Sequence, residues 1–240
     1  MKTGYTHIVV ILDRSQSMDS VREATINGFN EFLKTQKKLP GEATISLVQF
    51  NSTHETTYEN KNLLDAPELT EFTYIPDGMT AMNDAIGDSI NRVGAYLRGQ
   101  PEHVRPSKIL FMILTDGQEN SSKRFSGAQV KSMIEHQRGK YSWEFVFMGA
   151  NQDVVLTAKG LGIITSNAMA YDSNVTGTAH VFATASAGLG NYRGHTRGLV
   201  ENFFDPAAGA GVVVGGTLGG ISFPLVATPD DDDSNESSTT

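Results

Sequence analysis

The stretch that decides the fold is IVVILDRSQS, residues 8–17. Its first half, Ile8-Val9-Val10-Ile11-Leu12, is a continuous apolar run rich in β-branched side chains. Such a run is typical of a strand buried on both faces, as in a parallel sheet. Its second half, Asp13-Arg14-Ser15-Gln16-Ser17, brings a carboxylate and two hydroxyls directly after the strand. We therefore expect a central parallel strand with a polar turn at its carboxyl end.

Outward from this stretch, apolar runs alternate with amphipathic segments. Further strands are expected over 43–50, 109–114 and 145–148, and within 53–75 and 163–170. Helices are expected from two capping boxes, Ser20-Val21-Arg22-Glu23 and Ser126-Gly127-Ala128-Gln129, the second running through His136. Further helices are expected over 80–97, 153–162 and 175–189. Strands alternating with helices predict an α/β class, with a doubly wound, Rossmann-like, mostly parallel sheet flanked by helices.

Three polar segments should meet at one edge of this sheet, because parallel sheets place their ligand sites at the carboxyl ends of the strands. The first is the turn after Leu12. The second is Gly78-Met79-Thr80, at a predicted helix start, and the third is Thr115-Asp116-Gly117, after the 109–114 strand. They offer hard oxygen donors of the kind that Mg²⁺ prefers. The expected metal-site residues are Asp13, Ser15, Ser17, Thr80 and Asp116.

These residues resemble the von Willebrand factor A (vWA) domain and its metal-ion-dependent adhesion site, whose pattern is Asp-x-Ser-x-Ser, a distant Thr and a distant Asp. The resemblance covers roughly residues 5–190. It implies that Ser15, Ser17 and Thr80 bind the metal and that Asp13 and Asp116 often act through water. It also implies an acidic residue of a protein partner as the remaining ligand, and Mg²⁺ as the metal, with Mn²⁺ or Ca²⁺ as alternatives. The stretches LTDGQENSS and FMGANQD resemble small stand-alone bacterial or phage members.

Composition excludes several classes of function. The 240 residues carry a net charge of −8, and seven of the 27 acidic residues follow Arg197, after which no Lys or Arg occurs. The chain has no basic surplus for phosphates, so we expect no nucleic-acid partner. It has no Cys, which removes disulfides, thiolate metal sites and cysteine nucleophiles. The six His show no metal-ligand spacing and are interpreted as structural or surface residues.

The composition changes near residue 193, where we place a boundary between a vWA domain (1–192) and a Gly-rich, acidic C-terminal extension (193–240). A chain ending near residue 192 is expected to stay folded and to bind Mg²⁺. The extension is expected to mediate homo- or hetero-oligomeric assembly. Residues 206–228 are long enough for a membrane span, but six Gly and Pro224 argue against one. The N-terminal apolar run is too short for a signal peptide, so a cytoplasmic or virion location is expected.

The leading functional hypothesis is a non-enzymatic, metal-dependent protein-interaction module, one component of a larger assembly such as a phage virion tail or baseplate. An accessory subunit of an AAA-type ATPase or a stress-response protein is an alternative. A metal-dependent phosphatase or hydrolase is the enzymatic rival, but no motif ties a His or Lys to the site, and Ser15 stands where aspartyl phosphotransferases usually carry a second carboxylate. Asp84 and Glu119 are expected to be a helix-surface acid and a loop acid, with support of the metal ligands as the alternative for each. Asn83 is given no role.

Overall fold

The computed structural model describes residues 1–195, 200 and 202–204. Six strands form one sheet in the order β3-β2-β1-β4-β5-β6. All neighbouring strands are parallel except β2 and β3, which are antiparallel. The strands are β1 (Lys2–Asp13), β2 (Glu42–Phe50), β3 (His54–Asn62), β4 (Pro106–Thr115), β5 (Glu144–Gly149) and β6 (Ala168–Ala170).

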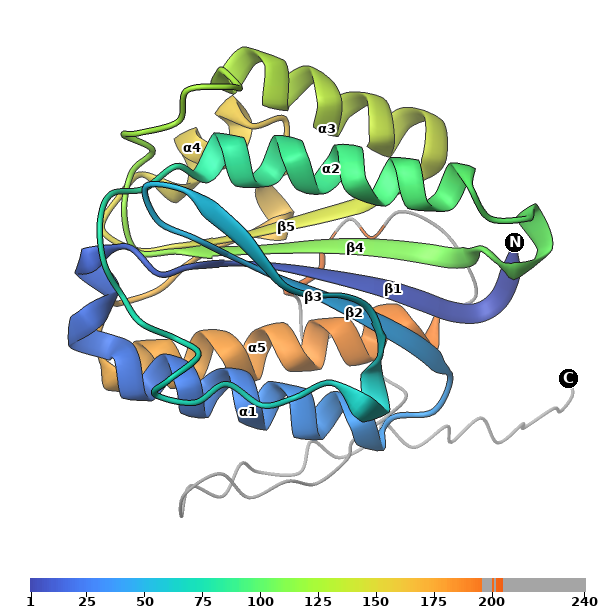
Figure 1. Cartoon of the computed structure of the whole chain (residues 1–240), viewed down its shortest axis with the longest axis horizontal. Coiled ribbons are helices and arrows are strands. Elements are labelled where there is room, and N and C mark those ends of the chain that lie inside the picture. The colour runs from blue at the N-terminus through green and yellow to red at the C-terminus, as the bar shows by residue number, and fades with distance from the viewer. Residues whose placement is uncertain (196–199, 201, 205–240) are drawn as a thin grey trace, which may run out of the picture.

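Helices cover both faces of this sheet (Figure 1). They are α1 (Arg22–Lys38), α2 (Met82–Arg98), α3 (Gly127–Tyr141), α4 (Val154–Gly160) and α5 (Val175–Gly194). Four short 3₁₀ helices occupy Gln16–Val21, Leu63–Asp65, Glu102–Val104 and Thr165–Asn167. The predicted α/β class and the doubly wound, mostly parallel arrangement are confirmed.

The alternation of side chains along β1 explains why both faces are covered. Ile8, Val10 and Leu12 join the core under α1 and α5, whereas Val9 and Ile11 join the core under α2, α3 and α4. Successive side chains of a strand point to opposite faces, so a strand that is apolar at every position needs helices on both sides. The apolar run at residues 8–12 thus determines the three-layer architecture.

Local predictions differ from the structure at two places. The box at Ser20 does not cap a helix: Ser20 lies inside the 3₁₀ helix Gln16–Val21, its hydroxyl donates to the Ser17 carbonyl, and α1 begins at Arg22. The strand expected within 163–170 is present as the short β6. The second box is confirmed, since Ser126 and Gln129 cap α3 reciprocally, but α3 extends beyond His136 to Tyr141.

The chain stays packed beyond the boundary drawn at residue 192. α5 ends only at Gly194, and Phe203 is buried in the core beside α5. The buried Glu144 carboxylate accepts the Val200 amide at 3.0 Å, and Asn167 Oδ1 accepts the Phe203 amide at 3.0 Å. The division into domain and extension stays a prediction, and residues 206–228 lie outside the described part of the chain. No helix among the described residues has the length and hydropathy to span a membrane.

Candidate metal site

The register of the sheet positions the site. β1 lies between β2 and β4. The connection that leaves β1 leads to β2 on one side of it, and the later connection from β3 leads to β4 on the other side. Leu12 of β1 pairs with Leu114 of β4, which brings the residues after both strands to one edge. This edge between β1 and β4 is a topological switch point, where open α/β sheets place their ligand crevice.

Asp13 is the most deeply buried residue of the site, with no exposed surface. Its Oδ1 accepts the Ser15 amide at 2.6 Å and its Oδ2 accepts the Thr115 hydroxyl at 2.5 Å. Burial raises the pKa of Asp13 to about 6, although these hydrogen bonds oppose the shift. The ionised carboxylate is therefore poorly solvated, and a nearby cation would stabilise it.

The hydroxyls and the second carboxylate meet above Asp13. Ser15 Oγ and Ser17 Oγ lie 3.1 Å apart, and Ser17 Oγ donates to Asp116 Oδ1 at 2.5 Å. A Cβ placed on Gly117 would lie 3.5 Å from Thr80 Oγ1 and 3.8 Å from Ser17 Oγ, so both hydroxyls border the same space. Ser15, Thr80 and Asp116 are nearly fully buried, whereas Ser17 is exposed and opens the cluster to solvent. The structure thus brings all five predicted residues together.

Asp116 has supports that the sequence reasoning missed. Ser173, in the turn between β6 and α5, donates its hydroxyl to Asp116 Oδ2 at 3.2 Å. Asn151 donates its side-chain amide to the Asp116 carbonyl at 3.1 Å. Asn151 lies in the FMGANQD stretch, so its position just after β5 was a usable signal, whereas nothing local marks Ser173.

The loop after Asp116 is clamped onto the start of α2. Asn120 pairs with the Thr80 backbone in both directions, at 2.8 and 3.0 Å. Glu119 accepts the Asn83 amide at 2.8 Å and the Ser122 hydroxyl at 2.8 Å. Glu119 is therefore not a free loop acid, because it caps α2 and holds the loop beside Thr80.

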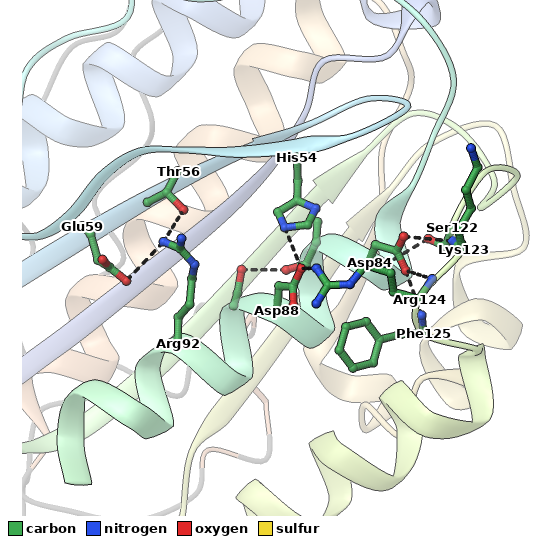
Figure 2. Close-up of polar contacts among 12 residues, drawn as sticks. His54, Thr56, Glu59, Asp84, Asp88, Arg92, Ser122, Lys123, Arg124 and Phe125 are labelled. Atoms are coloured by element: carbon green, nitrogen blue, oxygen red, sulfur yellow. Dashed lines mark hydrogen bonds and ion pairs between the residues drawn. The ribbon is translucent and has the colours of Figure 1, made fainter. Parts of the chain in front are cut away.

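Asp84 corrects a second expectation, since only 8% of it is exposed. Its carboxylate accepts the backbone amides of Lys123, Arg124 and Phe125 at 2.8–2.9 Å, as Figure 2 shows. Burial alone would raise the pKa of Asp84, but the three amides and the Arg124 charge outweigh it and lower the pKa. Asp84 is thus a structural anchor for the loop that follows Asp116.

Further ion pairs along α2 join it to the same loop and to β3 (Figure 2). Asp88 pairs with Arg124 of the loop and with His54 Nε2 of β3, the latter at 2.9 Å. One turn further, Arg92 contacts Thr56 at 3.1 Å and Glu59 at 3.7 Å. These partly exposed pairs contribute little stability individually, but they join α2, β3 and the loop.

The donor set suits a hard divalent cation. No group of three His, Cys, Asp or Glu side chains gathers among the described residues, so hydroxyl oxygens must supply much of any coordination at this edge. Two carboxylates balance the charge of one divalent ion, and serine and threonine oxygens fit Mg²⁺, Mn²⁺ or Ca²⁺ better than a metal that prefers sulfur or nitrogen. The residues present fit the metal that the sequence predicts.

The fold, but not the sequence as a whole, is similar to that of known proteins. No protein-family model and no curated protein matches the sequence. Among solved structures, proximal thread matrix protein 1 from the mussel byssus is 16% identical with a TM-score of 0.53, and the match covers 77% of this chain and 45% of that one. The same matrix protein has been solved with a zinc-occupied MIDAS motif, at 14% identity, a TM-score of 0.52 and the same coverage.

Two prokaryotic structures agree. The ArnB paralog VWA2 from Sulfolobus acidocaldarius is 15% identical with a TM-score of 0.51, over 76% of this chain and 45% of that one. The von Willebrand factor type A structure from Catenulispora acidiphila is 14% identical with a TM-score of 0.51, over 78% and 43%. This chain thus matches less than half the length of each of these proteins. The sheet order, the helical layers and these similarities together show that the chain has the von Willebrand factor A fold.

Proposed function

We propose that the chain is a non-enzymatic protein-interaction module that binds its partner through a divalent metal ion, Mg²⁺ in the first place. The observation that carries the proposal is the convergence of Ser15, Ser17 and Thr80 with two carboxylates at the switch point. The three hydroxyls would hold the ion. Asp13 and Asp116 would balance its charge and orient the hydroxyls, and a bound ion supplies an electrophilic centre for a partner's carboxylate.

The surface beside the site supports a protein partner. Exposed apolar side chains precede Thr80: Phe72 is 80% exposed, Ile75 52% and Met79 51%. This segment lies against the first turn of the site, since the Asp77 amide donates to the Arg14 carbonyl and the Gln16 amide donates to the Gly78 carbonyl. A partner that offers a carboxylate to the metal would bury these side chains and gain about 25 cal/mol for each Å² of apolar surface.

The carboxylate environment favours binding over catalysis. All the hydrogen-bond donors to the Asp13 and Asp116 carboxylates are hydroxyls or a backbone amide. A hydrolase needs a general base or acid within hydrogen-bond reach of its substrate, and no His or Lys contacts either carboxylate among the described residues.

The proposal also covers the assembly to which the chain belongs and its location. A component of a phage tail or baseplate, located in the cytoplasm and then in the virion, would use the metal site for one partner. It would use residues 193–240 for assembly with copies of itself or with another protein. Recruitment of an AAA-type ATPase through the same metal site is the alternative assembly role.

A matched pair of serine variants tests the proposal. Ser17→Ala removes a hydroxyl from the site, whereas Ser20→Ala removes an exposed hydroxyl from the same 3₁₀ helix. We expect the wild-type chain and Ser20→Ala to capture the same protein from a host lysate in Mg²⁺, and Ser17→Ala or EDTA to abolish that capture. Capture that survives both EDTA and Ser17→Ala would contradict a metal-bridged interface.

A further inference from the structure

A cavity lies at the end of the sheet opposite the candidate metal site. Its volume is about 450 Å³, within the usual range for small-molecule pockets. The start of β4 forms its floor, and the C-terminal turns of α2 and α3 form its sides; these parts lie together at one end of the molecule in Figure 1. Asp13 is the last residue of β1 and Asp116 directly follows β4, so both lie at the carboxyl ends of these strands. The cavity at the start of β4 is therefore separate from the metal site.

The lining of this cavity is cationic. Its charged lining residues are Arg98, Arg105, Lys108 and Lys140, together with His136, and no Asp or Glu among the described residues lines it. This concentration of positive charge is unexpected in a chain whose net charge is −8. A concave site lined by one sign of charge attracts small ions of the opposite sign.

Two of the cations are available to a ligand. Lys108 Nζ is already engaged by the carbonyls of Tyr192 and Arg193, at 2.8 and 2.6 Å. Arg98 and Lys140, by contrast, are exposed and make no hydrogen bond or ion pair within the part of the chain that the structure describes. Arg105 uses its Nε for the Gln100 carbonyl at 2.8 Å.

Arg98 and Lys140 lie in the last turns of α2 and α3, where a positive charge is favourable because of the helix dipole. Neither side chain donates to a helix carbonyl within the described residues, so both charged groups remain available to an anion. Lys108, in contrast, binds carbonyls at the end of α5.

The remaining lining mixes aromatic and aliphatic side chains with polar residues, among them Asn91, Ser107, Gln137 and Ser142. Trp143, only 4% exposed, stacks on Phe111 with ring centroids 5.5 Å apart. Tyr141 is half exposed and lies edge-on to His136. Leu97 and Ile90 of α2 also line the cavity. Aromatic and aliphatic walls with a few charged groups are typical of pockets that hold a planar organic molecule.

We propose that this cavity binds a small aromatic anion, a planar ring system that carries a phosphate or a carboxylate. The anionic group would contact Arg98 and Lys140, and the ring would lie against the aromatic lining. This site is independent of the proposed metal site and of any protein partner bound there.

Calorimetric titration of the full chain in EDTA tests the proposal, because EDTA removes any metal that could bind a phosphate or carboxylate. The probes are two matched pairs: adenosine monophosphate with adenosine, and nicotinate with nicotinamide. We expect at least one anion to bind at least tenfold more tightly than its neutral partner. Losing one charged contact in Arg98→Gln or Lys140→Gln should weaken that anion about tenfold.

A steric variant gives a second readout. Gly94 lines the cavity, and a Cβ there meets no atom within 4 Å, so Gly94→Trp should fill the space without disturbing α2. Gly139 of α3 is equally open but does not line the cavity, so Gly139→Trp is its control, and Lys159→Gln is the control for charge. Gly94→Trp should abolish binding, and both controls should retain it.

Three results would overturn the proposal. The first is no binding of either anion at millimolar concentration. The second is equal affinity for the anions and their neutral partners. The third is binding that Gly94→Trp leaves unchanged, since that would place the ligand elsewhere.

Discussion

Shortening the chain to end at Tyr192 is expected to destabilise it severely, whereas ending it at Phe204 is not. The longer form retains the Val200 and Phe203 backbone bonds to Glu144 and Asn167. The shorter form loses both bonds, together with the buried Phe203 side chain. This expectation replaces the one drawn from composition, that a chain ending near residue 192 stays folded.

The magnitude follows from three losses. Exposing a buried Phe costs about 2 kcal/mol. Leaving buried Glu144 and Asn167 acceptors without partners costs roughly 1–3 kcal/mol each. The sum, about 4–8 kcal/mol, is comparable with the whole stability of a typical domain, about 5–15 kcal/mol.

Urea unfolding monitored by the single Trp of the chain, Trp143, measures this directly, because Trp143 adjoins Glu144. The chain ending at Phe204 should show a cooperative transition, and the chain ending at Tyr192 should be unfolded, aggregated or shifted to a much lower midpoint. Equal midpoints for the two forms would refute the reasoning and restore the boundary at residue 192.

Three smaller perturbations test other parts of the structure. In Gly188→Ala the new Cβ would lie 2.5 Å from the Phe203 carbonyl oxygen, so the melting temperature of this variant should fall. A Cβ at Gly194 meets no atom within 4 Å, so Gly194→Ala should melt like wild type. Equal melting temperatures for the two variants would contradict the packing of Phe203. Burial lowers the pKa of His7 from 6.5 to about 4, so between these pH values only the unfolded chain takes up the proton, which costs up to about 3 kcal/mol of stability. Between pH 7 and pH 4.5, the free energy of unfolding should therefore fall less in His7→Asn than in wild type. Equal falls would exclude His7 as a source of acid sensitivity. Asp84→Asn should lower stability by about 2 kcal/mol and speed amide exchange at residues 123–125, and unchanged exchange would remove Asp84 as the anchor of that loop.

The architecture was predictable because its signals are local. Each central strand is a run of apolar residues, α2 has an apolar stripe, and α3 begins at a capping box, so type and order could be read along the chain. The convergence of the five candidate residues was also predictable, because the carboxyl ends of parallel strands share an edge. Asp13 and Asp116 directly follow or end such strands, and Thr80 precedes α2.

The failures come from contacts that no local pattern contains. Asp84 occupies an ordinary helical position, and only the fold of the 123–125 loop over it makes it a buried anchor. The box at Ser20 has the right residues, but burial of Met18 and Val21 favours a 3₁₀ turn there. The boundary at residue 192 stays a prediction; it followed a change in composition, which does not reveal that Glu144 accepts a hydrogen bond from the Val200 amide, 56 residues away.

Calorimetric titration of Mg²⁺ or Mn²⁺ into wild type, Asp116→Asn and Asp153→Asn tests the central claim most directly. Asp153 caps α4 through its side chain, a role that Asn also fills, so this variant controls for the loss of one carboxylate. We predict one ion bound per chain in wild type and in Asp153→Asn, and no measurable binding in Asp116→Asn. Identical titrations of wild type and Asp116→Asn would contradict it.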